Sequence, residues 1–161
     1  MIVGGGCRGR RLAAEMVADG HAVRISTRTD AGRDAIERAG AECWIGTPGR
    51  LATLRGALDS VTILCWMLGS ASGEEQELAA LHGTRLELFV TQAIDTTVRG
   101  FVYEARGTST PGAILLDGER IVRRLTALNS IPAAFLTADP TREQDWQSDA
   151  RAAIDTLLTR A

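Results

Sequence analysis

The sequence predicts an α/β protein: a three-layer, doubly wound fold in which a six-stranded parallel sheet carries helices on both faces. Three observations predict it. Short apolar runs alternate with segments whose apolar residues recur at helical spacing. The run over residues 61–68 (VTILCWML) has no polar alternation beyond Thr62, which is typical of a central strand covered on both faces. Strands joined by helices form right-handed crossovers and hence parallel pairs.

The expected elements follow one another with no linker, repeat or low-complexity segment between them. Strands are expected at residues 1–3, 21–27, 42–45, 61–68, 98–104 and 131–137. Helices are expected from about residue 8 to 19, from 30 to 40, and from 47, 72, 84, 110 and 139 onward. We therefore expect one domain over residues 1–161, without a separate substrate domain.

Capping residues mark most of the expected helix starts. Two spacings fit the capping box, and three pair a capping side chain with a first-turn proline: Ser72 with Glu75, Thr84 with Glu87, Thr47-Pro48, Thr110-Pro111 and Asp139-Pro140. After Pro48, Leu51, Leu54 and Leu58 lie at core spacing, which predicts a helix there.

Composition narrows the classes of function. The net charge of −2 gives no basic field for nucleic acid, although all 18 basic residues are arginine. No apolar run approaches the about 18 residues needed to cross a bilayer, and the start of the chain lacks a signal-peptide layout. Cys7, Cys43 and Cys65 suit a reducing cytoplasm. The histidines and cysteines are too scattered to form a metal site.

The stretch GGGCRG carries the clearest functional signal. Gly4, Gly6 and Gly9 fit G-x-G-x-x-G between the first strand and the first helix. Gly4 permits the tight turn, Gly6 lets the backbone approach a pyrophosphate, and Gly9 allows close contact between helix and strand. Cys7 lies in the same loop, and Arg8 either contacts a phosphate or points to water. The loop predicts dinucleotide binding; the alternative is a glycine turn without a ligand.

The end of the second strand indicates which dinucleotide. An acid about 20 residues past the glycines is typical of NAD binders, where it holds the ribose 2′-hydroxyl. Here Thr27 and Arg28 occupy those positions, and no acid precedes Asp30. A guanidinium binds a 2′-phosphate that a carboxylate would repel. NADP is therefore favoured over NAD; the alternative is that Arg28 is a solvated residue at a strand end.

Nearly the whole chain resembles the NAD(P)-binding Rossmann superfamily. The stretches GHAVRISTR, LRGALDSVTILCWMLGSA and NSIPAAFLTADP resemble the second strand, the fourth strand with its preceding helix, and the sixth strand of atypical short-chain dehydrogenase/reductase proteins. That group includes NmrA-like and sugar-nucleotide-epimerase-like proteins. The resemblance implies that Leu68, Gly69 and Ser70 lie along the cofactor, near its nicotinamide half.

The chain departs from this group in its catalytic residues. Active short-chain enzymes use a Tyr-x-x-x-Lys pair, whereas the one tyrosine, Tyr103, is followed four places on by Gly107, and the chain has no lysine. Extended members of the group also carry a C-terminal substrate domain, and no residues are left here to build one. Whether this protein is an enzyme therefore stays open.

Residues beyond the fifth strand are the remaining candidates for chemistry. Tyr103 and Glu104 are candidates to face a substrate, Arg106 to hold an anion, and residues 108–110 to offer hydroxyls. The alternative is that Tyr103 packs in the sheet while Glu104 and Arg106 are solvated or paired. We expect His82 at the surface and Cys65 in the core.

Three functions fit these residues. The first is an NADP-binding protein that senses or carries the dinucleotide or acts through a partner. The second is a small NADP-dependent oxidoreductase, with a small-molecule substrate, whose pocket is completed by a second subunit. The third, a methyltransferase-like or other nucleotide-binding domain, is disfavoured because Thr27 and Arg28 stand where such sheets usually carry an acid. A homodimer is expected, with its surface on the helix from Thr84 and on residues 101–112.

Overall fold

A computed structural model describes residues 1–160. Six parallel strands form one sheet in the order β3-β2-β1-β4-β5-β6. The strands are β1 (Ile2–Gly4), β2 (Arg24–Thr27), β3 (Glu42–Ile45), β4 (Ile63–Met67), β5 (Gly100–Glu104) and β6 (Ala133–Leu136). The helices are α1 (Gly6–Ala18), α2 (Arg33–Glu37), α3 (Glu75–His82), α4 (Thr84–Ile94), α5 (Gly112–Leu128) and α6 (Glu143–Leu158).

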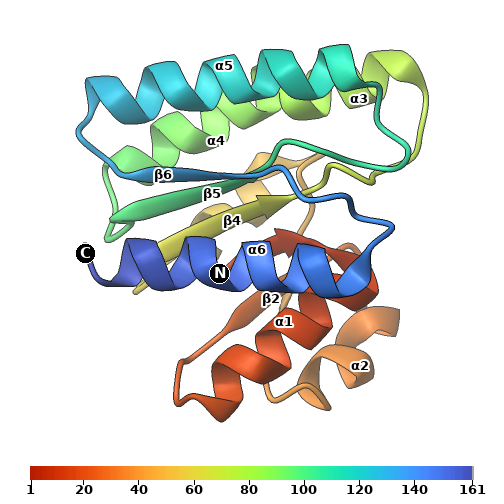
Figure 1. Ribbon diagram of the computed structural model, residues 1–161, viewed down its shortest axis with the longest axis vertical. Helices are drawn as coiled ribbons and strands as arrows, with labels where there is room; N and C mark the ends of the chain where they lie inside the picture. The colour runs from red at the N-terminus through yellow and green to blue at the C-terminus, as the bar shows by residue number, and fades with distance from the viewer. Residues whose placement is uncertain (161) are drawn as a thin grey trace.

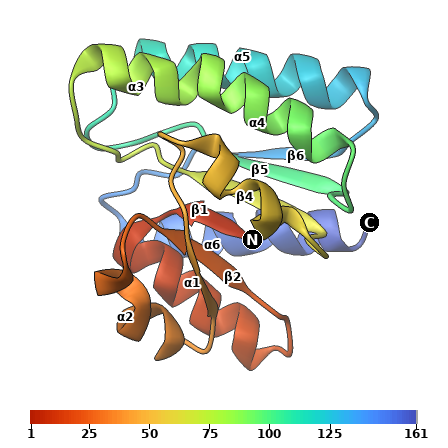
Figure 2. The same ribbon diagram turned by 180° about the vertical axis from the view of Figure 1, so that it is seen from behind.

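Helices cover both faces of the sheet, so the predicted doubly wound α/β fold is confirmed. Helices α3, α4 and α5 lie on one face, and α1, α2 and α6 lie on the other (Figures 1 and 2). Each face has its own buried apolar cluster. Within residues 1–160, no helix is long and apolar enough to cross a membrane.

The central strands feed both clusters because successive side chains of a strand point to opposite faces. In β1, Ile2 packs with α1 and α6, whereas Val3 packs in the cluster that contains α4 and α5. All five residues of β4 are buried, as its uninterrupted apolar sequence predicts. β4 pairs with β1 on one side and β5 on the other, so the direction of winding reverses between β1 and β4. Open α/β sheets bind ligands at such a switch point.

The helix predicted after Pro48 is wrong. The segment instead forms two short 3₁₀ turns, Leu51–Thr53 and Arg55–Leu58. Trp44 Nε1–H donates to the Thr53 carbonyl at 2.8 Å, so that oxygen is taken by a side chain from another part of the chain. Leu54 and Leu58 are nevertheless buried at the predicted spacing.

Most of the predicted side-chain caps are also absent. Neither α3 nor α4 has a side-chain hydrogen bond at its amino end, so both predicted capping boxes are wrong. The Thr110 hydroxyl donates to the Ala71 carbonyl at 3.1 Å rather than capping α5. Asp139 accepts from Thr141 N–H at 2.9 Å and forms a local turn before α6. The side chains predicted to cap these helices therefore form tertiary contacts or local turns instead.

Candidate functional site

A cleft of about 730 Å³ opens at the carboxyl ends of β1 to β4. Its walls come from the loop between β1 and α1, the end of β2, the loop after β3, the segment after β4, and the cleft side of α3 and the start of α4. Every residue that lines it lies between Gly4 and Arg85. No described residue after Arg85 contributes to the lining.

The glycine loop forms the centre of this cleft. Gly4, Gly5 and Gly6 all have left-handed backbone conformations, with φ of 86°, 82° and 52°. The Gly5 N–H donates to the Met67 carbonyl at 2.7 Å, which joins the loop to β4. α1 begins at Gly6, two residues before the predicted start. No side chain caps this end and its first turn carries no acid, so the positive end of the helix dipole is available to an anion in the cleft.

The three glycines of the motif differ in their surroundings. A Cβ atom on Gly4 would lie 2.6 Å from the Met67 carbonyl oxygen, and one on Gly9 would lie 3.2 Å from the Gly4 carbonyl oxygen. These two glycines therefore permit close backbone contact, as the motif predicts. At Gly6 a Cβ atom would meet nothing within 4 Å. Gly6 and Cys7 line the cleft, whereas Gly9 lies behind it.

The end of β2 presents an unpaired cation. Arg28 is exposed, lines the cleft, and makes no ion pair or side-chain hydrogen bond with any residue in 1–160. Thr27 also lines the cleft, and its hydroxyl donates to the Thr29 carbonyl at 3.3 Å. The nearest acid, Asp30, accepts from Arg33 Nε–H at 2.7 Å. No carboxylate on this loop therefore competes for Arg28.

The loop after β4 forms the wall on the other side of the glycine loop. Leu68 and Ser70 line the cleft, whereas Gly69 does not. The Gly69 N–H instead donates to Glu104 Oε2 at 2.7 Å, beneath the wall. The sequence thus brings Leu68 and Ser70 to the same cleft as the glycine loop and Arg28, with Gly69 as their support.

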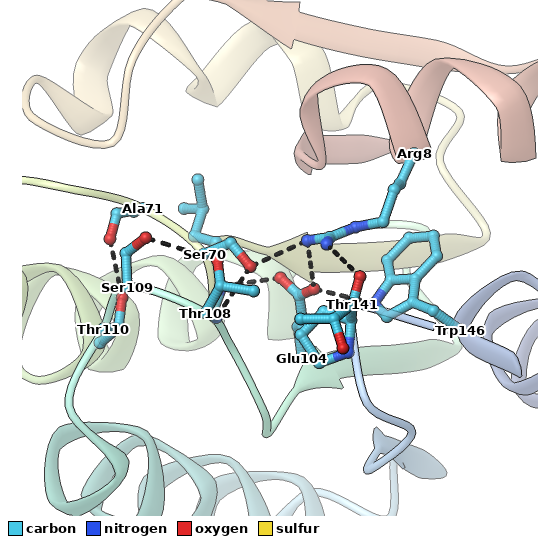
Figure 3. Close-up of polar contacts among 12 residues, drawn as sticks. Arg8, Ser70, Ala71, Glu104, Thr108, Ser109, Thr110, Thr141 and Trp146 are labelled. Atoms are coloured by element: carbon cyan, nitrogen blue, oxygen red, sulfur yellow. Dashed lines mark hydrogen bonds and ion pairs between the residues drawn. The ribbon is translucent and has the colours of Figure 1, made fainter. Parts of the chain in front are cut away.

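Arg8 lines the cleft, but its guanidinium is committed to other parts of the protein. It donates to Ser70 Oγ at 2.9 Å, to the Pro140 carbonyl at 2.9 Å and to Glu104 Oε1 at 3.3 Å. It also lies over the Trp146 ring, 5.0 Å from the centroid (Figure 3). Arg8 is therefore not a solvated side chain, and its contact with a phosphate stays a prediction.

Glu104 is the buried partner of this arginine. Its carboxylate is 1% exposed and accepts from Trp146 Nε1–H at 2.8 Å as well as from Arg8 and Gly69. Burial raises the pKa of Glu104, while the Arg8 charge and these hydrogen bonds oppose the rise. Both oxygens are engaged, and the residue does not line the cleft.

Tyr103 and His82 form a second buried polar group. Tyr103 is fully buried in β5, and its hydroxyl lies 2.8 Å from His82 Nδ1. His82 is also buried, so the expected surface position is wrong. The lowered pKa of His82, about 4, follows from burial, which disfavours the charged imidazolium. A neutral ring satisfies both of its contacts when Nε2–H donates to the Leu68 carbonyl at 3.2 Å and Nδ1 accepts from the Tyr103 hydroxyl, whose one proton is then shared with the Leu115 carbonyl at 3.2 Å.

The burial of His82 could have been found in the sequence. Leu78 lies four residues before it on the same helix and is buried. This spacing places His82 on the same helical stripe as a core leucine.

Arg106, the third candidate for chemistry, lies at the surface. It is 56% exposed and pairs with Asp139 at 3.1 Å. Neither Tyr103, Glu104 nor Arg106 lines the cleft. Their contacts match the alternative in which these side chains pack in the sheet or pair with other residues.

Comparison with known proteins identifies the fold. No protein-family model and no curated protein sequence matches the chain. Solved structures do match it. UDP-glucose 4-epimerase from Thermotoga maritima with UDP-glucose aligns with a TM-score of 0.69 at 12% identity, over 83% of this chain and 53% of the epimerase. The Citrobacter triphenylmethane reductase complexed with NADP(H) aligns with a TM-score of 0.60 at 21% identity, over 84% and 47%.

The chain has a Rossmann fold. A third match, UDP-glucuronic acid 4-epimerase from Bacillus cereus in complex with NAD, gives a TM-score of 0.64 at 11% identity, over 83% of this chain and 53% of that one. The Rossmann fold here spans about half the length of the solved structures it matches. The predicted likeness to reductases and epimerases is confirmed at the level of the fold.

Proposed function

We propose that this protein binds NADP(H) in the cleft and acts as a dinucleotide-binding or sensing protein of the atypical short-chain dehydrogenase type. The observation that carries the proposal is the uncapped amino end of α1, which opens onto the cleft with the unpaired Arg28 on the neighbouring strand. Among the similar structures, the triphenylmethane reductase is complexed with NADP(H) and the UDP-glucuronic acid 4-epimerase with NAD. The fold supports a nicotinamide dinucleotide, and Arg28 supports NADP.

The order of the strands orients the ligand. The glycine loop follows β1, with β2 on one side and β4 on the other. The loop and the start of α1 hold the pyrophosphate through backbone amides. Arg28 and Thr27 at the end of β2 hold the 2′-phosphate of the adenosine half. The nicotinamide half then lies along Leu68 and Ser70, after β4.

The surroundings of the cleft favour binding over catalysis. A bound nicotinamide dinucleotide would supply hydride chemistry. Acid–base catalysis would require a side chain positioned at the reacting atoms. Within residues 1–160, no residue after Arg85 lines the cleft, and Tyr103, Glu104 and Arg106 are engaged elsewhere. These contacts support a protein that holds or senses the dinucleotide.

A small oxidoreductase completed by a second subunit is the alternative function. Leu88 on α4 and Leu116 on α5 are 51% and 47% exposed, and they favour an association surface on this face. The other part of the expected dimer surface, residues 101–112, is corrected at residues 101–104, which are buried in β5, whereas most of the residues after them are accessible. Sedimentation of the protein with and without NADPH tests the homodimer. We propose a cytoplasmic location, which the free thiols of Cys7, Cys43 and Cys65 support.

Two glycine substitutions test the proposed site. Gly6→Ala places a methyl group where the pyrophosphate approaches, and we expect NADPH affinity to fall at least tenfold. Gly20→Ala is the matched control, because Gly20 also has a positive φ (91°) and open space around its Cβ position but lies at the other end of α1. Both changes strain the backbone similarly. Equal NADPH affinity for the two variants would contradict a pyrophosphate site at the glycine loop.

A further inference from the structure

Ser70 has an unusual set of hydrogen-bond partners. Its Oγ accepts from Arg8 Nη2–H at 2.9 Å and from the Thr108 N–H at 3.2 Å (Figure 3). The two donors come from α1 and from the loop after β5, which lie on either side of the segment after β4. Ser70 itself is half-buried and lines the cleft.

These contacts fix how the hydroxyl can interact with a ligand. A serine hydroxyl has two acceptor lone pairs and one proton to donate. Two N–H donors occupy its acceptor capacity, and no group within residues 1–160 accepts its proton. The charge on Arg8 also polarises the O–H bond, which makes it a stronger donor. Ser70 therefore offers the cleft a hydrogen-bond donor and no acceptor.

The residues on both sides of Ser70 are held in place by hydrogen bonds from side chains outside the cleft lining. The Leu68 carbonyl is bonded by His82, the Gly69 N–H by Glu104, and the Ala71 carbonyl by the Thr110 hydroxyl. None of these three supporting side chains lines the cleft. The hydroxyl is consequently positioned before a ligand arrives, so little conformational entropy is lost when it forms a hydrogen bond.

We propose that Ser70 donates a hydrogen bond to an oxygen acceptor on the nicotinamide half of the dinucleotide, with Arg8 and Thr108 as the residues that position it. This inference rests on the proposed function, since that function lays the nicotinamide half along the segment after β4. The chemistry required of the acceptor is an oxygen lone pair, which a phosphate, a ribose hydroxyl or the carboxamide carbonyl supplies. Arg8 thus acts on the ligand through Ser70.

Ser70→Ala tests the inference, with Ser148→Ala as the control. Ser148 is an exposed serine on α6 that lies outside the cleft lining and makes no side-chain hydrogen bond within residues 1–160. We expect Ser70→Ala to weaken NADPH binding about tenfold, as loss of one hydrogen bond to a ligand predicts, and Ser148→Ala to change it less than twofold. Ser70→Thr keeps the hydroxyl and is expected to retain most of the affinity.

Truncated ligands separate this role from a general loss of structure. Adenosine 2′,5′-bisphosphate lacks the nicotinamide half, so Ser70→Ala should bind it as the wild type does. If 2′-phospho-ADP-ribose shows the tenfold loss, the acceptor lies on the phosphate or the second ribose. If only NADPH shows it, the acceptor is the carboxamide. Either pattern supports the inference.

Three other outcomes overturn it. If wild-type protein and Ser70→Ala bind NADPH within twofold of each other, Ser70 is not a ligand donor, although the proposed function stands. If Ser70→Ala weakens NADPH and adenosine 2′,5′-bisphosphate equally, the serine has a structural role only. If the wild type binds no dinucleotide at all, the proposed function fails and this inference fails with it.

Discussion

Gly107 lies so close to Gly69 that a Cβ atom on Gly107 would sit 1.5 Å from the Gly69 carbonyl oxygen. The loops that follow β4 and β5 are therefore in direct backbone contact. Glu104 adds a hydrogen bond to the Gly69 N–H at the same place. The part of the described chain after Arg85 thus supports one wall of the cleft from behind, although it supplies none of the lining.

We expect Gly107→Ala to displace the wall of the cleft. The new methyl group has no room beside the Gly69 carbonyl, so the loop after β4 must move and NADPH affinity should fall at least tenfold. Gly112→Ala is the control, because a Cβ atom there would meet nothing within 4 Å. Fluorescence titration of both variants with NADPH measures the effect; unchanged affinity in Gly107→Ala would show that the loop contact is irrelevant to the cleft.

Arg28→Ala should change the choice of dinucleotide. Loss of the guanidinium removes the charge-assisted hydrogen bonds to a 2′-phosphate, so NADPH affinity should fall about tenfold while NADH affinity stays within twofold. Arg55→Ala is a suitable control, since Arg55 is also an exposed arginine but lies outside the cleft lining. A variant that loses NADPH and NADH equally would assign Arg28 a role unrelated to the 2′-phosphate.

His82 should make the protein less stable in mild acid. Its pKa is about 4 in the folded chain against an ordinary 6.5, so only the unfolded chain takes up the proton between these values. The buried, neutral His82 therefore costs no stability above pH 6.5, and the free energy of unfolding falls as the pH drops from 6.5 toward 4. Between pH 7.5 and pH 5 this amounts to about 2 kcal/mol of unfolding free energy, measurable by urea denaturation.

His82→Gln isolates that contribution, since glutamine does not titrate. Between pH 7.5 and pH 5, the free energy of unfolding of the variant should fall by about 2 kcal/mol less than that of the wild type. Glu104, whose pKa burial raises, changes stability in the opposite direction, and it is present in both proteins. If the two pH profiles run parallel, His82 is not held neutral by burial.

Arg8 should be coupled to Glu104 in stability. Arg8→Met leaves the buried carboxylate without its countercharge, and we expect a loss of about 2–4 kcal/mol in unfolding free energy. The same change made in a Glu104→Gln background should be milder by at least about 1 kcal/mol, because no charge is then stranded. Urea unfolding of the four proteins completes the cycle. Additive effects would mean that the two side chains do not interact.

The fold could be predicted because it depends on local patterns. The uninterrupted apolar run of β4 and the alternation of strands with helices are visible in the sequence, and both are determined by which face of each element is buried. Where a helix was predicted after Pro48, the chain forms two 3₁₀ turns and the Thr53 carbonyl accepts a hydrogen bond from Trp44. Periodicity does not reveal such a contact.

The candidate site, too, could be predicted only in part. Gly4, Gly6, Arg28 and Leu68 reach one cleft because the carboxyl ends of parallel strands share an edge of the sheet. The partners of Arg8 could not be predicted, since Ser70, Glu104 and Pro140 lie 62, 96 and 132 residues away in sequence. Only the folded chain brings them together.

Binding of NADPH and NADH by the wild-type protein tests the central claim most directly. Isothermal calorimetry together with nicotinamide fluorescence would give both dissociation constants. We expect one site per chain for NADPH and a dissociation constant for NADH at least tenfold higher, a difference of about 1.4 kcal/mol in binding free energy. Binding of neither dinucleotide at millimolar concentration would contradict it, and the glycine loop would then serve another ligand or none.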